Sequence, residues 1–179
     1  MSTGKLINVL GNVCEPQRSS DNEIAIIPHC CNDLGVMGAG VALALKQAFT
    51  GVEYYYLKSG HHLGKNSWVN PNTEKSDTII VNMVAQKGVR GKNNPIPIKY
   101  KALIDCMVAM RDDILKTIHM KPEYEGKHAV VHCPKFGSDL AQGNWDFILE
   151  LIRELWLEHG FDVVVYEFEP DKDKWGVIE

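Results

Sequence analysis

Apolar runs of strand length alternate with segments of helical spacing along the whole chain. The expected strands are 5–9, 23–28, 78–84, 129–133 and 162–168, and the expected helices are 41–49, 98–117 and 145–157. Whether the first helix continues through 54–58 is left open. Strands that alternate with helices pair in parallel and are covered by helices on both faces. We therefore expect an α/β fold, a three-layer α/β/α sandwich with a mostly parallel central sheet.

The length and composition fit one domain. The 179 residues, 45% of them hydrophobic and 23% charged, are enough for one sizeable core and few for two. We expect a single domain over residues 1–179, with its core at about 4–169. The tail at 170–179 should be loosely attached, although Trp175 could pin it.

Charge and cysteine usage narrow the class of ligand and the compartment. The net charge is −4 and the Lys and Arg residues are scattered, which disfavours binding of extended nucleic acid. No apolar stretch reaches the roughly 18 residues of a membrane span, and the N-terminus lacks the apolar region of a signal peptide. Five cysteines without C-x-x-C spacing favour free thiols. We expect a cytoplasmic protein with a nucleotide-sized ligand and no membrane partner.

A glycine-containing turn joins the strand at 23–28 to the helix at 41–49. Gly35, Gly38 and Gly40 let backbone N–H groups approach a ligand closely, and the following helix directs its partially positive N-terminus to the same place. The turn therefore predicts a phosphate site. The alternative is an ordinary tight turn, because the spacing matches neither common phosphate-binding glycine motif.

Three turns should meet at the carboxyl ends of the strands, where open α/β sheets bind ligands. They are residues 28–40, 84–97 and 134–143. In the third turn, Gly137 and Gly143 bracket a short loop whose N–H groups could face the first turn. Two such anion sites predict a diphosphate or a phosphorylated nucleotide. An ordinary strand-to-helix connection is the alternative for the third turn.

Five segments in register resemble one known family. They are Gly11-Asn12-Val13, residues 32–42, N-M-V-A-Q at 82–86, G-S-D-L-A-Q-G-N-W at 137–145 and V-V-V-Y-E-F at 163–168. Together they resemble a macro domain, most closely the small stand-alone branch that contains the yeast-type ADP-ribose 1''-phosphate phosphatase and the terminal ADP-ribose glycohydrolases. The resemblance implies that ADP-ribose, or a derivative, lies across the strand ends.

The resemblance also implies a set of binding residues. Asn12 would hold the adenine amino group, Phe168 would pack on the adenine beside Val13, and Asn32 would lie beside the distal ribose. Core packing is the alternative for Phe168, and a local turn cap for Asn32. The implied binding set is Asn12, Val13, Asn32, Gly38, Ala39, Gly40, Val41, Gln86, Gly137, Ser138, Asp139, Leu140, Ala141 and Phe168.

The activity that the resemblance implies is hydrolysis of ADP-ribose 1''-phosphate to ADP-ribose and phosphate. His29 is the leading acid–base candidate because imidazole titrates near neutral pH, although a histidine ending an apolar strand is also a common core residue. Asn32, Asp33 and Asp139 complete the candidate catalytic set. Asp139 stands where relatives usually have glycine, so it is either a catalytic carboxylate or a group that repels phosphate.

Other functions remain open at this stage. The chain could be a non-catalytic reader of ADP-ribose, or a hydrolase of O-acetyl-ADP-ribose or of protein- or nucleic-acid-linked ADP-ribose. The covalent glycohydrolase mechanism is disfavoured because Gln86 and Ala141 stand where that branch has lysine and aspartate, with Lys87 one residue away. The group 29–31 and 132–133 contains His and Cys, but without C-x-x-C spacing we expect no metal and no cofactor. Oligomeric state is left open.

Overall fold

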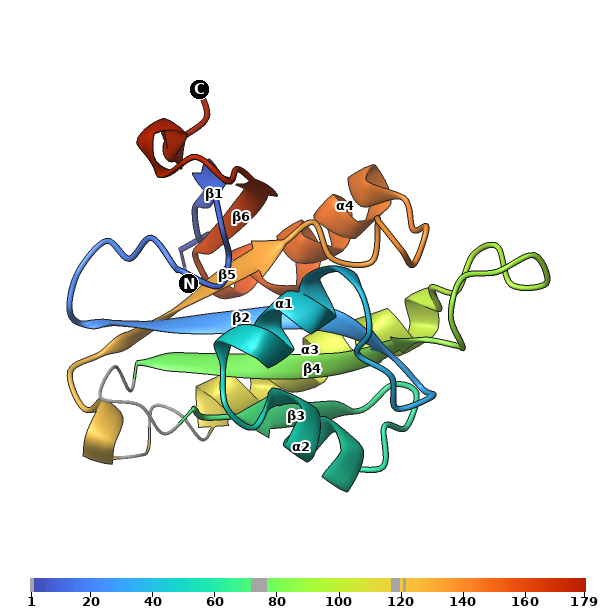
Figure 1. The fold of residues 1–179 in the computed structure, drawn as a ribbon. Coiled ribbons are helices and arrows are strands. Elements are labelled where there is room, and N and C mark those ends of the chain that lie inside the picture. The colour runs from blue at the N-terminus through green and yellow to red at the C-terminus, as the bar shows by residue number, and fades with distance from the viewer. Residues whose placement is uncertain (1, 72–76, 117–119, 121) are drawn as a thin grey trace.

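A computed structural model describes residues 2–71, 77–116, 120 and 122–179, which form a three-layer sandwich around one sheet (Figure 1). The sheet order is β3-β4-β2-β5-β6-β1-β7. Its strands are β1 Leu6–Gly11, β2 Glu23–Asn32, β3 Asn66–Val69, β4 Thr78–Gln86, β5 His128–Pro134, β6 Val163–Phe168 and β7 Gly176–Val177. The five inner strands pair in parallel, and only the edge strands β3 and β7 are antiparallel. The expected fold class is confirmed.

The helices cover both faces of the sheet (Figure 1). They are α1 Gly40–Ala48, α2 Val52–Lys58, α3 Tyr100–Lys116 and α4 Trp145–Leu155. Short 3-10 turns lie at Pro122–Tyr124, Leu157–His159 and Lys172–Lys174. One core cluster packs α3 and α4 against the sheet, with Leu103 and Ile152 fully buried, and a second packs α1 and α2 on the other face, with Leu45 and Tyr56 fully buried. Successive strand residues point to opposite faces, so the inner strands contribute to both clusters.

The structure answers one question that the sequence left open and corrects one expectation about local structure. The helix at 41–49 does not continue through 54–58, because Phe49, the C-cap of α1, has an extended backbone, and Gly51, with a left-handed φ of 91°, is the N-cap of the separate helix α2. The tail is not loosely attached, because β7 pairs with β1 and Ile178 N–H donates to Asn8 O at 2.8 Å. Trp175 Nε1 also donates to Glu169 O at 2.8 Å, so it pins the tail as anticipated.

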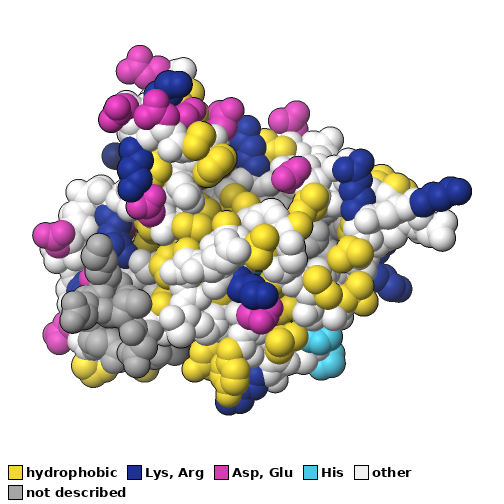
Figure 2. Space-filling model, in the orientation of Figure 1, with side chains coloured by type: hydrophobic (Ala, Val, Ile, Leu, Met, Phe, Trp, Pro, Cys, Tyr) yellow, Lys and Arg dark blue, Asp and Glu magenta, His cyan; other side chains and the backbone are white. Residues whose placement is uncertain are grey.

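The central strands are longer than their apolar runs indicate. Residues 29–32 belong to β2 rather than to the following turn, because β4 supplies ladder partners as far as Gln86. Within the described ranges, no helix is both long and apolar enough to cross a membrane. The face shown in Figure 2 carries Lys and Arg interspersed with Asp and Glu, with apolar side chains over its centre.

Candidate functional site

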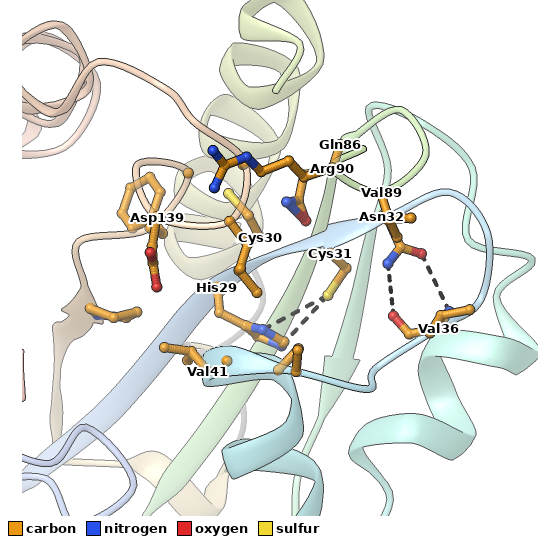
Figure 3. A pocket seen from close by; sticks show the side chains of 18 of the residues that line it. His29, Cys30, Cys31, Asn32, Val36, Val41, Gln86, Val89, Arg90 and Asp139 are labelled. Carbon is orange, nitrogen blue, oxygen red and sulfur yellow. Dashed lines mark hydrogen bonds between the residues drawn. The ribbon is translucent and has the colours of Figure 1, made fainter. Parts of the chain in front are cut away.

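A cavity of about 320 Å³ opens at the carboxyl ends of β2, β4 and β5 (Figure 3). Its walls come from residues 36–42, 86–90 and 134–141, and its floor from residues 29–32 at the end of β2. The three turns expected to meet at this edge therefore do meet. Of the predicted site residues, those that line the cavity are His29, Asn32, Gly38, Ala39, Gly40, Val41, Gln86, Gly137, Asp139, Leu140 and Ala141.

The N-terminus of α1 faces this cavity without a capping side chain. Its N-cap, Ala39, has extended backbone and no side-chain acceptor, and the first turn contains no acidic residue. The first helical hydrogen bond is donated by Leu43 to Ala39 O, so within the described chain the amides of residues 40–42 have no protein acceptor. By contrast, α4 is capped by Asn144, whose Oδ1 accepts from Phe147 N at 3.2 Å. The amides of α1 are therefore available to an anion.

The loop after β5 presents a second set of amides. Gly143 N donates to Gly137 O at 2.7 Å and closes the loop so tightly that a Cβ on Gly143 would lie 2.4 Å from that oxygen. Among the described residues, no acceptor binds the amides of 138–141. The Ser138 side chain turns back to donate to Lys135 O, and Ser138, expected among the binding residues, does not line the cavity. The loop is shaped as a second anion site opposite α1.

His29 lies on the floor of the cavity but is only 1% exposed. Its Nε2 donates to Asn82 Oδ1 at 2.6 Å, and Cys31 Sγ lies 3.7 Å from the same nitrogen. Burial lowers the pKa of His29 from 6.5 to about 4, although the bond to Asn82 acts in the opposite direction. The imidazole is therefore neutral near pH 7 with its proton already donated. This arrangement suits a residue that holds β2 against β4 and argues against the expected acid–base role.

The neutral state of His29 makes a prediction about stability. In the unfolded chain the His29 imidazole binds a proton below about pH 6.5, and in the folded protein only below about pH 4. The contribution of His29 to the free energy of unfolding is therefore fully present above pH 6.5 and declines as the pH falls from 6.5 to 4. Lowering the pH from 7 to 5 should remove about 2 kcal/mol of the free energy of unfolding through this residue. Urea denaturation at both pH values measures it. His29→Gln should lack this component, and an unchanged pH dependence in that variant would contradict the assignment.

Asn32 and Asp33 hold the first turn in shape. Asn32 Oδ1 accepts from Leu34 N at 3.0 Å and its Nδ2 donates to Val36 O at 2.8 Å. The Tyr56 hydroxyl lies 2.5 Å from Asn32 O and so ties α2 to the turn. Asp33 does not line the cavity; its Oδ1 accepts from Gly88 N at 2.7 Å and links the first turn to the 86–97 loop. These contacts fit the local-cap alternative for Asn32 and give Asp33 a positioning role.

Charged side chains reach the cavity from two loops. Asp139 is exposed and carries the carboxylate found among the described residues that line the cavity. Arg90 enters the cavity from the 86–97 loop (Figure 3). Sequence reasoning missed Arg90 because the loop that carries it has no regular pattern. A basic residue in the glycine-rich segment after a buried strand is the signal that could have found it. The other lining residues missed are Cys30, Cys31, Val36, Ala42, Gly88, Val89, Pro134, Lys135 and Phe136.

The residues expected to hold adenine lie outside this cavity, at the ends of β1 and β6. Phe168 is paired with Gly11 across the two strands and is 69% exposed, so the core-packing alternative is excluded. Asn12 Oδ1 accepts from Cys14 N at 2.9 Å, and Val13 is buried in the core. The exposed Phe168 ring ends β6, the strand next to β5.

Of the His and Cys residues considered as metal ligands, His29 and Cys31 lie close together, with Cys31 Sγ 3.7 Å from His29 Nε2. Within the described ranges, no group of three or more His, Cys, Asp or Glu side chains is arranged to hold a metal ion. The five cysteines are free thiols. Burial raises the pKa of Cys30, Cys31 and Cys133, so these thiols stay protonated and pack as small apolar groups.

Comparison with known proteins identifies the fold. Neither a protein-family model nor a curated protein matches the sequence. A protein of unknown function from Bacteroides thetaiotaomicron is 25% identical, with a TM-score of 0.73 over 91% of this chain and 98% of that chain. A macrodomain protein from Streptomyces coelicolor is also 25% identical, with a TM-score of 0.66 over 91% of this chain and 99% of that chain. Thermosipho africanus DarTG, solved in complex with ADP-ribose, is 16% identical, with a TM-score of 0.63 over 82% of this chain and 38% of that chain. The chain has the α/β fold of the Streptomyces macrodomain.

Proposed function

We propose that this macrodomain fold binds ADP-ribose across the carboxyl ends of its sheet and hydrolyses ADP-ribose 1''-phosphate to ADP-ribose and phosphate. The observation that carries the binding proposal is the uncapped N-terminus of α1, which lines the same cavity as residues 139–141, whose amides have no acceptor among the described residues. Backbone donors on both sides suit a diphosphate, whose oxygens accept several hydrogen bonds at once. The complex of the Thermosipho protein with ADP-ribose supports the choice of nucleotide.

The sheet order suggests how the ligand lies. Counted from the β7 edge of the sheet, the strands lie in the order β1, β6, β5, β2 and β4, and the loops that come after these strands lie in the same order. Adenine would pack on Phe168 beside the Asn12 turn at the β1 and β6 end. The diphosphate would then lie between the β5 loop and the N-terminus of α1. The distal ribose would extend over the end of β2 toward the β4 loop, close to Asn32 and Gln86.

Asp139 is the residue that we propose for catalysis. His29 is buried and neutral, and Asp33 accepts from Gly88 N outside the cavity. Among the described residues that line the cavity, the remaining candidate is the carboxylate of Asp139. In the proposed step a water oxygen attacks the terminal phosphorus while its proton passes to the Asp139 carboxylate. The bond between phosphorus and the 1'' oxygen breaks, the proton held by Asp139 passes through water to that oxygen as it leaves as a hydroxyl, and amide donors neutralise charge on the phosphoryl oxygens. Gln86 and Ala141 at the cavity wall do not offer the lysine and aspartate of a covalent route.

Calorimetry combined with a product assay tests this function. We expect free ADP-ribose to bind with a micromolar dissociation constant, roughly −7 to −8 kcal/mol, as for a nucleotide held by backbone donors and one aromatic contact. The protein should release phosphate from ADP-ribose 1''-phosphate and leave O-acetyl-ADP-ribose and protein- or DNA-linked ADP-ribose unchanged.

Each alternative function has its own outcome in these assays. No heat with millimolar ADP-ribose would remove the binding function. Binding without turnover of any substrate would make the protein a reader. Release of ADP-ribose from a linked substrate, without phosphate release, would replace the phosphatase with another hydrolase.

A further inference from the structure

Arg90 is a cation at the mouth of the cavity. Its side chain is exposed and lines the cavity, and it forms no ion pair with any residue that the structure describes. Figure 3 shows it reaching over the cavity from the β4 side, while Asp139 approaches from the β5 loop. An unpaired guanidinium beside an anion site is a strong recognition group for phosphate.

The loop that carries Arg90 is fixed at its base and at its tip. Asp33 N donates to Gln86 O at 2.9 Å, and Gly88 N donates to Asp33 Oδ1 at 2.7 Å. Asn94 Nδ2 donates to Lys87 O at 2.8 Å and to Val89 O at 3.0 Å, on either side of Gly88. The backbone that presents Arg90 is therefore ordered before any ligand binds, which lowers the entropic cost of using the side chain.

The position of Arg90 indicates which part of a ligand it would meet. The β4 loop lies beyond the β2 end, on the side opposite to Asn12 and Phe168 in the sheet order. Lys135, the cation that follows β5, lies nearer the place proposed for the diphosphate. If adenine packs on Phe168, an extended dinucleotide-like ligand presents its far end to Arg90.

We infer that Arg90 is a specificity-determining residue that recognises a phosphate group on the distal ribose and so favours ADP-ribose 1''-phosphate over ADP-ribose. This inference rests on the proposed binding of ADP-ribose and goes beyond it by assigning the terminal phosphate to a side chain. The planar guanidinium can donate two parallel hydrogen bonds to phosphate, which a lysine cannot do. Asp139 enters the cavity from the other side, where the proposed function has it take the proton of the attacking water.

Calorimetry with two ligands on four proteins tests this inference. All proteins carry Asp139→Asn so that ADP-ribose 1''-phosphate is not consumed during the titration. With Arg90 present, ADP-ribose 1''-phosphate should bind at least ~10-fold more tightly than ADP-ribose, as expected for a charge-assisted pair. Arg90→Ala should reduce this ratio to about 1–2 while changing the affinity for ADP-ribose by less than ~3-fold. Arg90→Lys, which keeps the charge without the fork, should give an intermediate ratio.

Lys92→Ala is the matched control. Lys92 is an exposed cation on the same loop but does not line the cavity, so its removal tests general charge attraction. The ratio should survive in this variant. Three outcomes would overturn the inference about Arg90 and leave the proposed function standing. The two ligands could bind equally well with Arg90 present, the preference for ADP-ribose 1''-phosphate could survive Arg90→Ala, or Arg90→Ala could weaken both ligands equally. Absence of binding for both ligands in every protein would overturn the proposed function with it.

Discussion

Replacing Ala39 with Asp is expected to abolish ADP-ribose binding while making the fold more stable. Ala39 already has the extended backbone of an N-cap, so an Asp carboxylate there can accept from the free amides of α1. That cap should add about 0.5–1 kcal/mol to the free energy of unfolding. The same carboxylate occupies the donors proposed for the diphosphate and repels it, so affinity should fall by at least ~100-fold. Urea denaturation and calorimetry measure the two effects, which have opposite signs.

Ala39→Asn separates the two causes of this loss. An asparagine caps the helix nearly as well as aspartate but carries no charge, so it should stabilise the fold and weaken ADP-ribose binding less than Ala39→Asp does. Because a damaged fold would lose stability together with binding, the gain in stability is the internal check. Unchanged affinity in a stabilised Ala39→Asp protein would show that the phosphates do not lie at the N-terminus of α1.

The layers of the fold could be predicted because they depend on periodicity, which short segments carry by themselves. The apolar runs of β2 and β4 indicated buried parallel strands, and the apolar spacing of residues 98–117 indicated α3. The strand ends could not be located in this way. Polar residues such as His29 and Asn32 stay in β2 because a neighbouring strand pairs with them, and pairing is not a local property.

The edges of the sheet escaped prediction for a related reason. The four residues of β3 and the two of β7 are too short to give a pattern, and each is a strand only because an inner strand offers a free edge. Gly51 illustrates a different limit. Glycine is tolerated inside helices at a modest cost, so only the structure shows that α1 ends at the extended Phe49 and that Gly51, with a φ of 91°, precedes a separate helix.

The candidate site was predicted more completely for backbone than for side chains. Glycine positions such as Gly137 indicate where a chain can turn tightly, and the turns that they mark do enclose the cavity. The role of a side chain depends on partners that are distant in sequence. His29 was expected to titrate near neutral pH, but its bond to Asn82 and its burial come from the packing of β2 against β4. Arg90 was missed because only the folded loop brings it to the cavity.

Asp139→Asn is expected to reduce phosphate release by at least ~100-fold while leaving ADP-ribose binding equal or tighter. The amide keeps the size of the side chain but cannot take a proton from the attacking water, and general-base contributions are typically ~10²–10⁴-fold. Removing a negative charge from the cavity also removes a repulsion of the phosphates on the order of 1 kcal/mol in a partly solvated site. Steady-state phosphate release and calorimetry on the same protein separate the two effects, because a loss confined to kcat indicates a group that acts in the transition state.

Asp33→Asn provides the matched control for Asp139. It removes the same charge from a carboxylate that lies outside the cavity, and an amide oxygen can still accept from Gly88 N. This variant should retain phosphate release within a few-fold, because the 86–97 loop keeps its anchor. If Asp33→Asn loses activity and Asp139→Asn retains it, the catalytic carboxylate is Asp33. If Asp139→Asn changes neither turnover nor affinity, the Asp139 side chain points to solvent, and water must be activated by phosphate oxygens rather than by a protein carboxylate.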